Sequence, residues 1–173
     1  MKLSYLIRGL PGHPLHPPLT GATIGAYTAG TVAGFASIIG VAEKPAAHAW
    51  WLALIVGLIA TGPTAITGLA DWLTISRGTP LWRTATSHLI AMVSATGFFL
   101  IAALIGHDGY THGVVASGAY VLTLIGFGLM TVGGWIGGSI VYVHGMRVLK
   151  LVDEPAGRAV SPAPKPEKEE AEA

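Results

Sequence analysis

The sequence contains no cysteine and few charged residues. Lys, Arg, Asp and Glu together make up 11% of its 173 residues, whereas soluble domains carry about 25% charged residues. The absence of cysteine excludes disulfides, thiolate metal sites and cysteine-ligated iron–sulfur clusters within this chain. The shortage of charge indicates a membrane protein, and the net charge of +1 gives no reason to expect nucleic acid as a partner.

The charged residues that are present lie outside four long apolar runs. A helix needs about 20 apolar residues to cross the hydrocarbon core, and backbone polar groups inside a bilayer must be satisfied within the element. We therefore predict an all-α fold, an integral membrane four-helix bundle. The runs that no Lys, Arg, Asp or Glu interrupts are 19–41, 49–70, 86–106 and 114–143.

The same pattern divides the chain into three parts. Residues 1–18 form an N-terminal strap with a His-Pro motif, and residues 19–152 form the four-helix transmembrane domain. Residues 153–173 are rich in Pro, Ala, Glu and Lys without apolar periodicity, which predicts a disordered tail.

Basic residues indicate the orientation of the chain in the membrane. They precede the first run, occupy the connection between the second and third runs, and follow the fourth run. By the positive-inside rule, both termini and that connection are cytoplasmic, in a multi-pass protein of the inner (plasma) membrane. The basic residues concerned are Lys2, Arg8, Arg77, Arg83, Arg147 and Lys150.

Threading the chain in this way brings four of the seven histidines to the cytoplasmic face. His13 and His16 lie in the strap, His88 opens the third run and His144 closes the fourth. Thr84 or Thr86 could cap the third helix. An aspartate and an arginine reach the same face after the second run, at Asp71 and Arg77. The remaining histidines, expected to be solvated loop residues of the opposite face, are His48, His107 and His112.

Three functions compete for this group of side chains. Two histidines on different helices could hold a haem iron axially, three or four with Asp71 could bind a bare zinc or iron ion, or the group could serve proton relay or a quinone headgroup. Gly133, Gly137 and His144 share one stripe of the fourth helix, which suits either close helix packing or a flat cofactor. A transporter would need ionisable residues deep in the helices, and the sequence places only hydroxyls there.

Several of these motifs resemble the bacterial membrane protein family called domain of unknown function 2231. The resemblance covers about residues 9–150. It implies a four-helix fold and an association with Rieske iron–sulfur domains, hence electron transfer. Because this chain has no cysteine, such a Rieske-type partner would be a separate protein. The motifs that carry the resemblance are Gly12-His13-Pro14-Leu15-His16-Pro17, Thr67-Gly68, Asp71-Trp72, His88, and Gly137-Gly138 followed by Val141-Tyr142 and His144-Gly145.

These observations favour a b-type haem-binding protein that is at most an electron-transfer subunit, with quinone or a redox protein as its partner. His88 and His144 are the expected axial ligands, with His13 and His16 as supporting or alternative ligands. Asp71 is expected to orient a ligand imidazole, and Arg77 to pair with a haem propionate. The alternative is a non-catalytic membrane protein whose histidines and Asp71 form a structural or mononuclear metal site.

Overall fold

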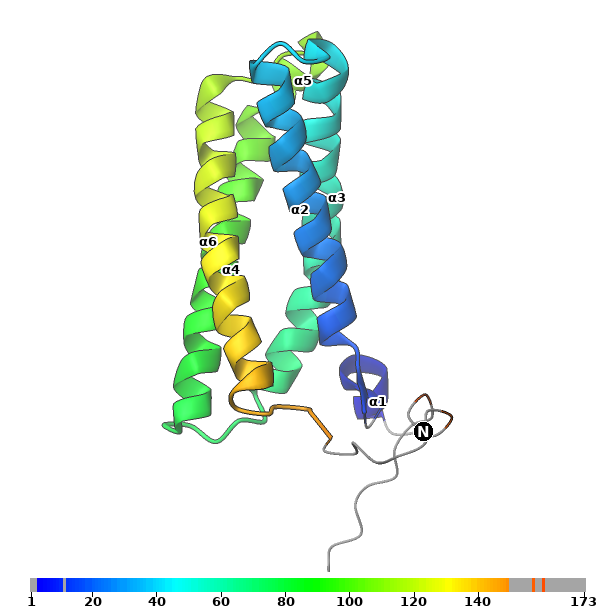
Figure 1. Ribbon diagram of the computed structural model, residues 1–173, viewed down its shortest axis with the longest axis vertical. Coiled ribbons are helices and arrows are strands. Elements are labelled where there is room, and N and C mark those ends of the chain that lie inside the picture. The colour runs from blue at the N-terminus through cyan, green and yellow to red at the C-terminus, as the bar shows by residue number, and fades with distance from the viewer. Residues whose placement is uncertain (1–2, 11, 150–156, 158–159, 161–173) are drawn as a thin grey trace, which may run out of the picture.

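Four long helices lie side by side in the computed structural model, which describes residues 3–10, 12–149, 157 and 160 (Figure 1). The predicted all-α class is confirmed, apart from one pair of two-residue strands. The predicted tail falls outside the described residues except at 157 and 160. In chain order the elements are α1 (Leu3–Arg8), β1 (Gly9–Leu10), β2 (His13–Pro14), α2 (His16–Ile38), α3 (Glu43–Trp72), α4 (Pro80–Ile105), α5 (His107–His112) and α6 (Ser117–Tyr142).

The long helices form two antiparallel hairpins, α2 with α3 and α4 with α6. Each helix packs most extensively against the other helix of its own hairpin. The start of α2, the end of α3, the start of α4 and the end of α6 meet at one end of the molecule, beside α1 (Figure 1). We call this the histidine end, and the opposite end, which carries α5, the α5 end.

Among the described residues, three helices are long and apolar enough to cross a membrane, namely α3, α4 and α6. The prediction of four such helices is therefore confirmed for three of them. Helix α2 corresponds to the first predicted run, but its glycines, threonines and serine dilute its apolar character. Whether α2 also crosses the bilayer, and which side the termini occupy, remain predictions.

The prediction that Thr84 or Thr86 caps the third membrane helix, α4, was wrong. Helix α4 begins at Pro80 because Thr79 precedes it in an extended conformation, and its hydroxyl accepts a hydrogen bond from the Trp82 amide at 3.1 Å. Proline suits this first position since it has no N–H to leave unpaired. The predicted caps, Thr84 and Thr86, instead donate their hydroxyls to carbonyls one turn earlier in the helix.

The buried core joins the two hairpins in their middle and toward the α5 end. The rings of Tyr27 and Phe99 stack at 3.9 Å between α2 and α4. Nearer the α5 end, the buried Trp50 indole donates to the Thr123 hydroxyl across 3.2 Å, which ties α3 to α6. No member of this core cluster comes from residues 57–94 of the described chain, so the histidine end is held together by other contacts.

Small residues allow the helices to approach closely in this core. A Cβ added at Gly34 would lie 2.7 Å from atoms of Trp50 and Tyr120, and one at Gly57 would lie 2.5 Å from Tyr27. By contrast, nothing lies within 4 Å of a Cβ added at Gly21 or Gly25. The glycines of α2 thus allow close packing in the second half of the helix and not in the first.

The outer faces of the helices are apolar and exposed. Val32, Ile59 and Leu104 retain 63%, 71% and 67% of their accessible surface. Such surface in a soluble monomer would be a large uncovered apolar area, whereas lipid chains cover it naturally. The outward apolar side chains are therefore suited to contact with lipid.

Candidate functional site

His16 stands in the first turn of α2 and reaches across to α3. Its Nδ1 lies 3.0 Å from the Thr64 carbonyl oxygen and 3.2 Å from the Thr67 hydroxyl. The ring rests on Gly68, where an added Cβ would lie 2.6 Å from its Cε1 atom. A glycine at position 68 is therefore what lets the imidazole lie against the backbone of α3.

His88 makes the same arrangement in the other hairpin. Its Nδ1 lies 2.8 Å from the Gly133 carbonyl oxygen of α6, and a Cβ added at Gly137 would lie 3.0 Å from its Cε1 atom. In each hairpin, then, an imidazole bonds to one carbonyl of the neighbouring helix and packs on the glycine four residues later. The two halves of the molecule share a local design that the sequence alone did not reveal.

The hydrogen bonds fix which ring nitrogen carries the proton in both histidines. A carbonyl oxygen can only accept, so Nδ1 must be the donor in His16 and in His88. In the neutral ring Nε2 then keeps its lone pair. Neither Nε2 atom forms a hydrogen bond with a described residue. This is the tautomer in which histidines bind metals through Nε2 while a backbone carbonyl orients the ring.

The electrostatic surroundings favour the neutral form of His16, which precedes the apolar run beginning at residue 19. Burial lowers the pKa of His16 below its ordinary value of 6.5. The hydrogen bond to the Thr64 carbonyl opposes this effect and raises its pKa. Smaller contributions to the pKa come from His88, which lowers it, and Asp71, which raises it. His88 and Asp71 therefore both belong to the electrostatic surroundings of His16.

Asp71 bonds to two arginines and not to an imidazole. Its Oδ1 accepts from Arg8 Nε and from Arg147 Nη2, each at 2.9 Å. Arg147 Nη2 also donates to the Arg8 carbonyl oxygen, and Arg8 Nη2 donates to the Thr74 hydroxyl at 3.2 Å. The expectation that Asp71 orients a ligand imidazole is thus wrong among the described contacts. We call Arg8, Asp71 and Arg147 the arginine cluster.

Sequence reasoning used Arg8 and Arg147 only to assign topology and missed their part in this cluster. They are 139 positions apart in the chain, and nothing in the pattern of either segment pairs it with the other. The one available signal was that Asp71 would need a partner, because an acidic side chain at a helix end is seldom buried alone. Arg77, the neighbour in sequence that was expected to pair with a haem propionate, is exposed.

The other two predicted histidines, His144 and His13, are more exposed than His16 and His88. His144 is exposed beyond the end of α6, and its Nε2 lies 3.1 Å from the Thr84 hydroxyl. His13 is exposed in β2, where it pairs with Leu10. Within the described ranges, no three His, Asp or Glu residues come together in a way that could hold a metal ion. The four predicted histidines thus separate into an inner pair and two outer residues.

At the α5 end, the other three histidines are exposed, as expected. His48 and His107 nevertheless pack edge-on against aromatic rings, of Tyr110 and Trp51 respectively, with centroids 5.2 Å apart in both pairs. The segment expected to be a loop there contains the short helix α5. These contacts anchor α5 on α3.

The helices, their apolar outer faces and the histidine end together define a helical membrane protein. Residues 12–150 match the family described as "Predicted membrane protein (DUF2231)", and the chain belongs to this family. The resemblance noted from the sequence motifs is thereby confirmed. Comparison with curated proteins gives no match, and none of the solved structures matches the chain.

Proposed function

We propose that this membrane protein is a b-type haem-binding electron-transfer subunit in which His16 and His88 are the axial ligands. The observation that carries the proposal is the matched geometry of the two imidazoles. Each holds Nδ1 on a backbone carbonyl and keeps Nε2 unbonded to described residues, and they come from different hairpins. The pair replaces the sequence-based choice of His88 with His144, since His144 Nε2 lies beside Thr84.

The donor set suits haem better than a bare metal ion. Haem supplies four ligands of its own, so the protein needs to add only two imidazoles. A mononuclear zinc or iron site normally needs at least three protein ligands, and the described residues bring no such group together. Gly68 and Gly137 also leave one side of each ring next to backbone, without a side chain that would compete for space.

In this proposal, haem supplies one-electron redox chemistry when it is bound. The chain orients the two imidazoles through the carbonyls of Thr64 and Gly133, which also raises their basicity as ligands. Quinone or a Rieske-type redox protein would exchange electrons at the cytoplasmic side of the inner membrane.

The proposal is tested by a dithionite-reduced minus oxidised absorption spectrum. The full chain is expressed with ample haem precursor and purified in a neutral detergent. We expect a haem α-band in the wild-type protein and its loss in His88→Ala, whereas His112→Ala at the α5 end retains it. A wild-type protein without the band, or a band that survives in His88→Ala, rejects the proposal. Metal analysis of a haem-free sample would then examine the mononuclear alternative.

A further inference from the structure

The arginine cluster carries more positive charge than it neutralises. Two guanidinium groups share the single carboxylate of Asp71, which leaves one positive charge uncompensated within the cluster. Asp71 is the one acidic residue that the described part of the chain brings to the histidine end. Arg8 and Arg147 keep 30% and 27% of their side-chain surface accessible, so the excess charge is open to a ligand.

Some N–H groups of Arg8 and Arg147 are not used by the hydrogen bonds within the arginine cluster. Among the described residues, Nη1 of Arg8 and Nη1 of Arg147 have no hydrogen-bond acceptor. Arg147 Nε is a buried donor that also lacks a partner in the described chain. An unpaired buried donor is costly and rare in native structures, so this set of donors is incomplete without an acceptor.

The backbone around Arg147 is held in an uncommon conformation. Arg147 has φ 63°, in the left-handed region that residues other than glycine seldom adopt. Such residues persist where the surroundings fix them, and they are frequent in ligand-binding sites. Here the hydrogen bonds to Arg8 and Asp71 link the Arg147 side chain to the N-terminal strap and to the end of α3.

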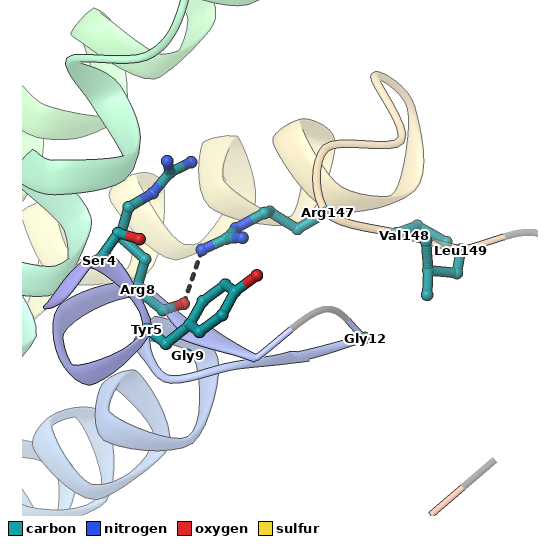
Figure 2. A pocket seen from close by; sticks show the side chains of 8 residues that line it. All are labelled: Ser4, Tyr5, Arg8, Gly9, Gly12, Arg147, Val148 and Leu149. Carbon is teal, nitrogen blue, oxygen red and sulfur yellow. Dashed lines mark hydrogen bonds between the residues drawn. The ribbon is translucent and has the colours of Figure 1, made fainter. Parts of the chain in front are cut away.

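Hollows lie on both sides of the two arginines. One, of about 300 Å³, is lined by Tyr5, Val148 and Leu149 among others, and Figure 2 shows Tyr5 and Arg147 beside it. The other, of about 510 Å³, lies toward Ile75 and Leu81. Each therefore combines guanidinium donors with apolar side chains at the end of the membrane helices.

We propose that the arginine cluster binds a phosphate group. Guanidinium forks match the geometry of phosphate oxygens and form charge-assisted hydrogen bonds with them. A phosphodiester carries one negative charge, which equals the excess charge of the cluster. The group can belong to the headgroup of an anionic lipid, whose chains would follow the apolar lining, or to a soluble phosphate compound. This site is separate from the imidazole pair and does not depend on haem.

Phosphorus NMR titration of the full-length protein tests the proposal. One arm adds inorganic phosphate, and the other adds phosphatidylglycerol to micelles of neutral detergent. We expect saturable broadening of the phosphorus signal in at least one arm. Saturation by phosphatidylglycerol alone identifies a lipid site, and saturation by inorganic phosphate identifies a site for soluble phosphates.

Variants separate the cluster from general attraction to positive charge. Arg147→Asn removes the guanidinium with a residue that tolerates positive φ, and we expect affinity to fall about tenfold or more because charge-assisted hydrogen bonds are lost. Arg147→Lys keeps the positive charge but lacks the planar guanidinium group. Its affinity for phosphate should therefore lie between those of the wild type and Arg147→Asn. Arg83→Asn removes an exposed arginine of α4 as the matched control. Absence of saturation in both arms, or equal weakening by Arg147→Asn and Arg83→Asn, overturns the proposal.

Discussion

The imidazole of His16 links the charge state of one residue to the stability of the fold. Because burial lowers its pKa below 6.5 in the folded protein, the unfolded chain binds a proton more readily than the folded chain does. The unfolded state is therefore favoured progressively as the pH falls below 6.5, and the stabilisation is complete above that value. The hydrogen bond between His16 Nδ1 and the Thr64 carbonyl also depends on the position of the ring against α3.

We predict that thermal unfolding in detergent shifts to lower temperature between pH 7.5 and pH 5.5, and that His16→Gln weakens this shift. Glutamine fills similar space but does not titrate. His112→Gln, which alters an exposed histidine, is the matched control and should leave the shift intact. An equal pH dependence in the wild-type protein and His16→Gln would show that His16 is not the group responsible.

Asp71 holds together segments from both ends of the chain. We predict that Asp71→Asn destabilises the protein by about 2 kcal/mol, since hydrogen bonds to charged groups are lost and two guanidinium groups face each other without a carboxylate. The carboxylate keeps only 10% of its side-chain surface accessible, so water replaces it poorly. The measurement is the unfolding midpoint in detergent.

Asp108→Asn provides the control for this change. Asp108 is exposed in α5, and its Oδ1 lies 3.9 Å from His112 Nδ1. Surface pairs of this kind contribute about 0–1 kcal/mol. Similar losses for the two variants would contradict a structural role for the arginine cluster.

Among the elements, α2 and α3 are joined at the histidine end through the contact of His16 with Gly68. We predict that Gly68→Ala destabilises the hairpin by about 1–3 kcal/mol, because overpacking displaces the ring. Gly62→Ala on the same helix has nothing within 4 Å of the added Cβ, and alanine should stabilise the helix by up to about 1 kcal/mol. Unfolding midpoints that move in the same direction for both variants would contradict this assignment.

The positions of the long helices could be predicted from the sequence because charge and hydropathy mark membrane segments strongly. Their ends could not be predicted as well. The start of α4 depends on Thr79 and Pro80, which lie before the apolar run. The reduced apolar character of α2 results from its small and hydroxyl residues, and half of its glycines serve contacts with Trp50 and Tyr120 that no local pattern shows.

The candidate site was predictable in its location but not in its pairings. The topology places His16 and His88 at the same end of the molecule, and this follows from the number of predicted membrane crossings. Which side chains meet depends on helix rotation and on the path of the strap, and both are set by packing at distant positions. For that reason His144, which was expected to act together with His88, bonds instead to Thr84, one turn before His88 in α4, and Asp71 pairs with Arg8 and Arg147.

For the whole molecule, the absence of cysteine permits single-cysteine labelling of the membrane topology. We predict that Ser76→Cys and Thr111→Cys react with an impermeant thiol reagent from opposite sides, because the apolar helix α4 separates these exposed positions. Ser4→Cys should react from the same side as Ser76→Cys if α2 crosses the bilayer as well.

The wild-type chain without cysteine is the background for this experiment. Labelling of Ser76→Cys and Thr111→Cys from the same side would contradict a membrane crossing by α4. Labelling of Ser4→Cys from the side of Thr111→Cys would show instead that α2 does not cross.

The most direct measurement of the central claim is a titration of the haem-free protein with haem, followed by its absorption spectrum. Two axial imidazoles predict a six-coordinate, low-spin spectrum that saturates at one haem per chain. His16→Ala should bind haem more weakly and give a five-coordinate, high-spin spectrum through His88 alone, whereas His144→Ala should match the wild type. A His16→Ala spectrum identical to that of the wild type, or no saturable binding at all, would contradict the assignment of His16 and His88 as the ligand pair.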